Sequence, residues 1–355
     1  MSKYELIFLS TNRSDFSYII DLLQTLVSDY CSKFKLKLIF IDNYNEYKKF
    51  YKDPISKKLK NYFLKENTPN FYKNFKDIYS KNKNEKFTFI IGDRKEMMIY
   101  ANLAYFFNSK IIHIGGGENT PNSPDQLHRN IISSISDLHF CSNFKAKQRV
   151  KKHTKSHNVY VIGVSSGQIL KQFNYKKKIK IEKKYKINLY ECALFCYHSE
   201  NENLQYEKHF LLNLFNLLKK YKIKTIITSS NNDLNGIYIN KIYESLSGDY
   251  MNYIPNLGFD EYRYFIKNCK FMIGNSSSGI VESNLFDKLS LNIGYRQQGR
   301  DCDQNVKKFN FDLTRIERFL AKKKYKINNK KTNKIYSYKN STRIIMSNLN
   351  NYLNI

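Results

Sequence analysis

The sequence predicts an α/β protein built from two Rossmann-like domains with a ligand cleft between them. Short apolar, β-branched runs alternate with longer amphipathic stretches, which is the pattern of parallel sheets covered by helices. This alternation is interrupted near residues 165–185 by a lysine-rich segment that we expect to link the two halves. A chain of 355 residues is also too long for one ordinary core. We therefore expect an N-terminal domain at 1–170 and a C-terminal domain at 171–355.

Each expected strand is a short apolar run that ends in glycine or polar residues. These runs lie at 4–10, 36–42, 86–92, 110–115, 138–141 and 158–163 in the first half, and at 190–197, 224–229, 251–258, 271–275 and 289–294 in the second. The tail is expected to end in a helix within 337–353. In such sheets ligands bind beyond the carboxyl ends of the strands, so the polar residues that follow each strand are the candidate site residues.

The strong positive charge has two explanations. Sixty Lys and Arg against 31 Asp and Glu give a net charge of +29, which could indicate nucleic-acid binding. The same excess would follow from AT-rich codons, which also favour the abundant Asn, Ile, Tyr and Phe. The lysines are spread over the whole chain, and no helix-turn-helix, zinc-finger or RNA-binding signature accompanies them. We expect no nucleic-acid partner.

Cysteine usage and apolar runs indicate a reduced, cytoplasmic protein without a membrane span. The six cysteines are scattered, with no CxxC pair and no metal-ligand spacing. No apolar run approaches the length of a membrane span, and the apolar start lacks a signal-peptide cleavage pattern. His113 and His139 lie inside apolar strands, so we expect them in the core and expect no metal site.

Two strand ends in the first half carry candidate site residues. Arg13 lies in the turn after the strand at 4–10, where backbone N–H groups and a helix dipole would suit a phosphate. Asp93 follows the strand at 86–92, which is a common position for a catalytic carboxylate. The alternative for Asp93 is a helix N-cap.

The stretch 110–140 adds further candidates. A strand opens into Gly115–Gly117 and then Glu118, a loop that lets the backbone approach a ligand and leaves a carboxylate exposed. Asp125 and Arg129 follow, four residues apart on one face of a helix. Their alternative explanation is an i,i+4 ion pair.

The sharpest motif in the second half follows the strand at 271–275. Its candidate residues are Asn275, Ser276, Ser277, Ser278, Gly279 and Glu282. Three hydroxyls and a glycine at a strand-to-helix junction suit a phosphate, whereas a helix cap needs only one serine. Glu282, about one turn later, could accept hydrogen bonds from the two hydroxyls of a ribose. His198 and Arg296 follow neighbouring strands at the same edge.

Taken in order, seven segments resemble the hydrolysing UDP-N-acetylglucosamine 2-epimerases and their UDP-N,N'-diacetylbacillosamine 2-epimerase relatives. They are TNRSD (11–15), GDRKE (92–96), HIGGGENT (113–120), DQLHR (125–129), NNDLNG (231–236), GNSSSGIVES (274–283) and NIGYRQQGR (292–300). The resemblance implies the GT-B arrangement of two Rossmann-like domains, with a C-terminal helix that crosses back to the N-terminal domain.

The resemblance also implies the roles of the candidate residues. The catalytic set would be Asp93, Glu118, Asp125 and His198, and the substrate-binding set Arg13, Arg129, Asn275, Ser276, Ser277, Ser278, Gly279, Glu282 and Arg296. The implied reaction needs no metal and no other cofactor: a carboxylate removes the proton at C2, UDP leaves from C1, and water then adds to the glycal. The product would be a free manno-configured sugar for surface-glycan or sialic-acid synthesis. The implied partners are a UDP-sugar and further copies of the chain, as a dimer or tetramer, with no membrane.

Several positions depart from the family pattern. Gln126 stands where relatives carry a second acid, Asn130 where many carry histidine, and Asn12 where glycine is usual. The region 43–85 lacks the family's Gly-Met-His loop. These departures leave open the sugar that is bound and the carboxylate that acts as the base. The changes at 126 and 130 also leave open a UDP-sugar-binding protein that has lost catalysis. A GT-B glycosyltransferase is a further alternative, which would keep the serines but would not need the three carboxylates to converge with His198.

Overall fold

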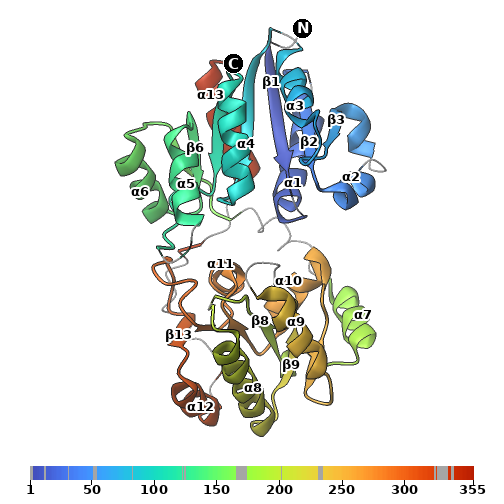
Figure 1. Cartoon of the computed structure of the whole chain (residues 1–355), viewed down its shortest axis with the longest axis vertical. Helices are drawn as coiled ribbons and strands as arrows, with labels where there is room; N and C mark the ends of the chain where they lie inside the picture. The colour runs from blue at the N-terminus through green and yellow to red at the C-terminus, as the bar shows by residue number, and fades with distance from the viewer. Residues whose placement is uncertain are drawn as a thin grey trace. The chain divides into compact units, whose positions relative to one another are not determined.

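The computed structural model describes residues 3–11, 13–30, 32–50, 54–81, 83–121, 123, 125–164, 174–200, 202–230, 235–323, 325, 335–336 and 340–355. The chain folds into two compact units. Unit 1 comprises Met1–Ser165 and Lys339–Ile355, and unit 2 comprises Ser166–Tyr338 (Figure 1).

Unit 1 contains a seven-stranded parallel sheet with the order β3-β2-β1-β4-β5-β6-β7. Its strands are β1 (Tyr4–Ser10), β2 (Phe34–Ile41), β3 (Lys60–Leu64), β4 (Glu85–Ile91), β5 (Lys110–Ile114), β6 (Leu138–Cys141) and β7 (Val159–Val161). This is the Rossmann order, and the direction of winding reverses between β1 and β4. Ligands of doubly wound sheets bind beyond the strand ends at such a reversal.

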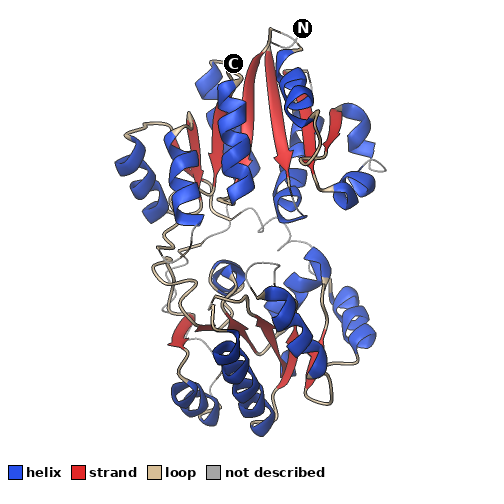
Figure 2. Cartoon of the chain, in the orientation of Figure 1, coloured by secondary structure: helices blue, strands red, loops and turns tan. Residues whose placement is uncertain are grey.

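Both faces of this sheet are covered by helices, as Figure 2 shows. Alternate residues of β1 point to different cores: Leu6 and Phe8 to one, Ile7 and Leu9 to the other. The helices are α1 (Arg13–Asp29), α2 (Tyr44–Phe50), α3 (Phe71–Ser80), α4 (Lys95–Phe106), α5 (Asp125–Ser134), α6 (Phe144–Thr154) and α13 (Ser341–Leu353), with a 3-10 turn at Pro54–Lys58. Residues of α1 and α13 contribute to the first core, and those of α3 and α4 to the second.

The C-terminal helix returns to unit 1. Ile345, Met346 and Leu349 of α13 are buried in the same core as β1. The Ser341 hydroxyl donates to the Ile162 carbonyl at 3.0 Å, and Tyr4 Oη donates to the Leu353 carbonyl at 3.3 Å. The expected crossing of the last helix to the N-terminal domain is confirmed.

Unit 2 repeats the same topology with six parallel strands in the order β10-β9-β8-β11-β12-β13. The strands are β8 (Cys192–Cys196), β9 (Lys224–Ile227), β10 (Met251–Tyr253), β11 (Phe271–Gly274), β12 (Ser290–Ile293) and β13 (Val306–Asn310). The helices are α7 (Tyr175–Tyr185), α8 (Leu204–Lys220), α9 (Gly236–Ser245), α10 (Gly258–Asn268), α11 (Val281–Leu285) and α12 (Leu313–Ala321), with 3-10 turns η3 (Leu189–Glu191) and η4 (Ser277–Gly279). The winding reverses between β8 and β11, and the two-domain α/β prediction is confirmed.

Every expected strand is present, and two further strands were missed. Both β3 and β13 lie at sheet edges, where exposed lysines such as Lys60 and Lys307 interrupt the apolar pattern. The lysine-rich segment expected to be a linker is in part the helix α7, which buries Ile181 in unit 2. Within the described ranges, no helix is long and apolar enough to span a bilayer.

Candidate active site

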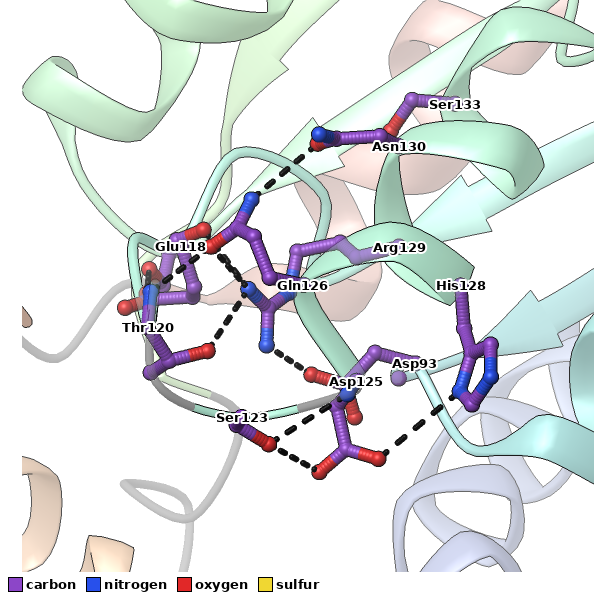
Figure 3. Close-up of polar contacts among 12 residues, drawn as sticks. Asp93, Glu118, Thr120, Ser123, Asp125, Gln126, His128, Arg129, Asn130 and Ser133 are labelled. Atoms are coloured by element: carbon purple, nitrogen blue, oxygen red, sulfur yellow. Dashed lines mark hydrogen bonds and ion pairs between the residues drawn. The ribbon is translucent and has the colours of Figure 1, made fainter. Parts of the chain in front are cut away.

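In unit 1 the central contact is an ion pair between Asp93 and Arg129 (Figure 3). Asp93 follows β4 through Gly92, whose φ of +79° turns the chain at the C-terminal end of the strand. Arg129 lies on α5 and is 1% exposed, and its Nη2 donates to Asp93 Oδ2. The alternative that Asp93 caps α4 is wrong, because the N-cap residue is Arg94 and no side chain caps that helix. A buried guanidinium therefore orients the Asp93 carboxylate, which is 24% exposed.

The second terminal nitrogen of Arg129, Nη1, binds the loop that precedes α5 and the first turn of that helix. Nη1 donates to the Glu118 carbonyl at 2.7 Å, to Thr120 Oγ1 at 3.1 Å and to Gln126 Oε1 at 3.1 Å. These contacts attach the glycine loop to the helix that carries Arg129. The guanidinium that holds Asp93 is thus fixed from several sides.

Asp125 does not form the i,i+4 pair with Arg129, so the alternative explanation of these two residues is wrong. Its Oδ2 accepts from the Ser123 hydroxyl at 2.9 Å, and its Oδ1 lies 3.9 Å from Nδ1 of His128 (Figure 3). The Asp125 side chain is 36% exposed. It is the most accessible of the three candidate carboxylates, Asp93, Glu118 and Asp125.

Glu118 is buried rather than exposed, contrary to the expectation from the glycine loop. It is 7% exposed, and its Oε1 accepts from the Ser142 hydroxyl. The preceding Gly117 has a φ of +80°, and a Cβ there would overlap the carbonyl of Ala146. The glycine therefore allows close packing against α6, and this packing buries the carboxylate.

Gln126 and Asn130, the two departures from the family pattern, bind each other. Gln126 Nε2 donates to Asn130 Oδ1 at 3.1 Å, and Gln126 Oε1 accepts from the Thr120 N–H at 2.7 Å (Figure 3). The neutral amide thus offers an acceptor to the loop and a donor to its neighbour at once. A carboxylate at 126 has no hydrogen to donate, so it could not donate to Asn130 Oδ1.

His113 supports the turn before Asp93. It is fully buried, with Nδ1 3.0 Å from Ser133 Oγ and Nε2 2.9 Å from the Gly92 carbonyl. Burial lowers the pKa of His113 to about 4, although the Gly92 carbonyl acts in the opposite direction. The imidazole is therefore neutral at physiological pH. The prediction that His113 and His139 belong to the core is confirmed.

In unit 2 the strand ends at the winding reversal are joined by Asn275. Its side chain is fully buried, accepts from the His198 N–H at 2.7 Å and donates to the His198 carbonyl at 2.8 Å. Gly274 has a φ of +139°, and a Cβ there would overlap the carbonyl of Cys196. Asn275 and Gly274 together hold the end of β8 against the end of β11.

The three serines follow directly. Ser277–Gly279 form the 3-10 turn η4, and the α11 helix after it has only five residues. Ser277 is exposed. Ser278 Oγ lies 2.6 Å from Tyr262 Oη and donates to Ser276 Oγ at 3.1 Å. Tyr262, on α10, was missed because nothing in its local sequence connects it with the serines.

Glu282 lies near two cations. Burial raises the pKa of Glu282, whereas the charges of Arg263 and Arg300 lower it. On the neighbouring strand end, the Arg296 N–H donates to the Glu200 carboxylate, and Gln297 Nε2 donates to the Asn275 carbonyl at 3.0 Å. Glu282 and Arg296 thus lie on segments that adjoin the serines.

Part of the expected site lies outside the described residues. This applies to the side chain of Arg13, to Asn12 and to residues 231–234 of the NNDLNG segment. In the portion of the chain that the structure describes, no three His, Cys, Asp or Glu side chains are grouped as metal ligands would be.

Two parallel sheets of Rossmann order, each with polar residues at its winding reversal, define a protein of GT-B-like fold. The profile described as UDP-N-acetylglucosamine 2-epimerase matches residues 60–350. The chain belongs to this family.

Similar proteins agree with this assignment. The GDP/UDP-N,N'-diacetylbacillosamine 2-epimerase (hydrolyzing) of Campylobacter jejuni is 36% identical over 225 residues, covering 61% of this chain and 58% of that protein. The Neisseria meningitidis UDP-GlcNAc 2-epimerase, solved with UDP-GlcNAc, has a TM-score of 0.77 at 17% identity, over 98% of this chain and 99% of that chain. The S. aureus MnaA–UDP structure has a TM-score of 0.78 at 16% identity, over 100% and 97%. The chain spans less than two thirds of the length of the curated relatives that it matches.

Proposed function

We propose that the protein is a hydrolysing 2-epimerase of a nucleoside-diphosphate-linked 2-acetamido sugar. A base removes the C2 proton, the C1–O bond breaks, and the nucleoside diphosphate leaves with the bonding electrons. Water then adds to the 2-acetamidoglycal, placing hydroxyl on C1 and a proton on C2. The result is a free sugar of inverted configuration at C2. Among the possible substrates, we favour a UDP-diacetamido-trideoxy sugar, because the Campylobacter relative is named for diacetylbacillosamine.

One observation carries the proposal: the Asp93 carboxylate is held beyond the C-terminal end of the central strand β4 by a guanidinium that is itself almost fully buried. Removal of a weakly acidic C–H proton requires a base of fixed orientation, and Arg129 supplies that orientation from the protein side. Glu118 belongs to the same hydrogen-bonded loop, since Arg129 binds its carbonyl. Asp125 is the accessible acid on the helix that carries Arg129. Under the proposal, these three carboxylates act on the sugar.

Unit 2 supplies groups for the leaving diphosphate. Under the proposal, Ser276, Ser277 and Ser278 donate to phosphate oxygens, together with His198 and Arg296, and Glu282 accepts from the ribose. The exposure of Ser277 and the hydroxyl chain from Tyr262 through Ser278 to Ser276 support this role. Arg13 would add a further cation.

Nucleotide release from candidate sugars tests the proposal. We expect UDP release from UDP-N-acetylglucosamine or a UDP-diacetamido sugar, and a fall in turnover of about 100-fold or more in Asp93→Asn and in Glu118→Gln. UDP affinity should change little, since these side chains act on the sugar. Asp137→Asn is the matched control: Asp137 is a partly buried acid beyond the opposite end of this sheet, where it accepts from the Ile111 N–H at 2.8 Å.

Two results would contradict the proposal. One is UDP release at the wild-type rate by both Asp93→Asn and Glu118→Gln, which would show that these carboxylates take no part in the mechanism. The other is release that depends on an added acceptor sugar, which would instead identify a GT-B glycosyltransferase.

A further inference from the structure

Glu200 binds a backbone turn that lies far away in the sequence. It follows β8, two residues beyond His198, and its Oε1 accepts from the Tyr295 N–H at 2.8 Å. Its Oε2 accepts from the next N–H, that of Arg296. Gly294 has a φ of +74°, and a Cβ there would overlap the Glu200 carboxylate. Only glycine at 294 leaves room for this contact.

Consecutive backbone N–H groups that curve around an anion form a nest, a backbone arrangement that binds carboxylates or phosphates. Here the chain fills the nest with its own carboxylate. The same turn carries Arg296, and its Gln297 donates to the carbonyl of Asn275, the first residue of the serine segment. Glu200 therefore fixes the turn that adjoins residues 275–278.

The charge of Glu200 decides whether both contacts can form. The ionised carboxylate accepts at both oxygens, whereas the protonated form carries a hydrogen on one of them. Burial raises the pKa of Glu200 to about 7; the two backbone N–H groups and Arg296 oppose this shift, and the nearby Glu207 adds to it. Tyr197, which donates to Glu207 at 2.7 Å, stays neutral because burial raises its pKa far above its usual value.

We infer that Glu200 is a positioning residue for the leaving nucleoside diphosphate: in its ionised form it holds the Arg296 turn against the serine segment through two backbone N–H groups, and protonation weakens that hold. This inference rests on the proposed function, in which that segment binds the diphosphate. The role is distinct from catalysis, because the Glu200 carboxylate contacts the protein backbone.

The test compares UDP affinity of the wild type, Glu200→Gln and the control Glu202→Gln at pH 8 and pH 6, by calorimetry. Gln at 200 keeps the size of the side chain but directs an amide N–H at one of the two backbone donors. We expect about tenfold weaker binding than wild type at pH 8, as for a lost hydrogen bond to a charged group. At pH 6 only about 10% of Glu200 is ionised, so the ratio of the UDP affinities of wild type and Glu200→Gln should approach one. Contributions of other titrating groups, including UDP itself, are common to both proteins and cancel in the ratio.

Glu202 is exposed, so Glu202→Gln makes the same change in charge without touching the turn and should bind like wild type at both pH values. A ratio for Glu200→Gln that is the same at pH 8 and pH 6, or equal to one at both, would overturn the inference. Hydrogen exchange of residues 294–300 is the second measurement and needs no ligand. Exchange at pH 8 should be faster in Glu200→Gln than in Glu202→Gln, and equal rates would also overturn the inference. Absence of UDP binding by the wild type at pH 8, with fast exchange in Glu200→Gln, would refute the proposed function alone.

Discussion

Replacement of Arg129 by Met is the perturbation that most directly tests the organisation of unit 1. Met preserves much of the volume of the side chain but removes the charge and all the donors. The variant loses the ion pair with Asp93 and the hydrogen bonds to the Glu118 carbonyl, Thr120 and Gln126. Asp93 would then keep its charge without the buried cation that orients it.

The magnitude follows from these contacts. Removing one partner of a fully buried ion pair destabilises a protein by roughly 3–5 kcal/mol. Asp93 is 24% exposed, so water can partly solvate the stranded carboxylate, and the loss should lie near the lower limit. We expect a decrease of about 3 kcal/mol in the free energy of unfolding, which for a unit of this size lowers Tm by about 6–12 °C.

Calorimetry of single and double variants provides the assay. Arg94→Met is the control, because Arg94 forms a surface pair with Glu96 in which both side chains are about 40% exposed. Such a pair contributes about 1 kcal/mol at most. In the double variant Asp93→Asn/Arg129→Met, the loss in the free energy of unfolding should differ from the sum of the two single losses by about 1–3 kcal/mol. Additive effects, or a loss in Arg129→Met no larger than in the control, would refute the role of Arg129.

Three further predictions concern unit 2. Replacing Ser277 and Ser278 by Ala should weaken UDP binding by about 1–3 kcal/mol in calorimetry, and unchanged affinity in a folded variant would remove the serines from the site. Gly274→Ala should lower Tm, since its Cβ would overlap the Cys196 carbonyl and force β8 from β11; an unchanged Tm would contradict this. The stability of Glu200→Gln relative to wild type should rise with pH by on the order of 2 kcal/mol between pH 5 and pH 8 in urea unfolding. Burial raises the Glu200 pKa from 4.5 to about 7, so the wild type loses stability as pH rises toward 7, whereas Gln does not titrate. The hydrogen bonds that Gln loses change the difference at every pH but not this slope, and a difference independent of pH would be inconsistent with the titration.

The sequence was sufficient for most of the fold because buried parallel strands are continuous apolar runs. The strands β1 and β4 are of this kind, with burial extending over almost their full length. The edge strand β13 was missed because Lys307 and Lys308 break its apolar run. The return of α13 to unit 1 was anticipated only through the family resemblance, since local patterns do not reveal which core a terminal helix joins.

The site was less predictable because its decisive contacts join residues far apart in the sequence. The spacing in the sequence suggested Asp125, four residues away, as a partner of Arg129. The partner in the structure is Asp93, which lies 36 residues away. Glu200 and Tyr295 are separated by 95 positions, and no motif connects them. Sequence reasoning named the serines and the carboxylates as candidates, but the groups that contact them, such as Tyr262, emerged only from the tertiary structure.

The fate of the hydrogen at C2 tests the central claim most directly. The protein is incubated in deuterated water with a UDP-2-acetamido sugar, and the products are examined by NMR. The proposed elimination and hydration predicts UDP, a free manno-configured sugar and deuterium at C2. A released sugar that retains its original proton and configuration at C2 would contradict the mechanism, because the C1–O bond would then have broken without deprotonation.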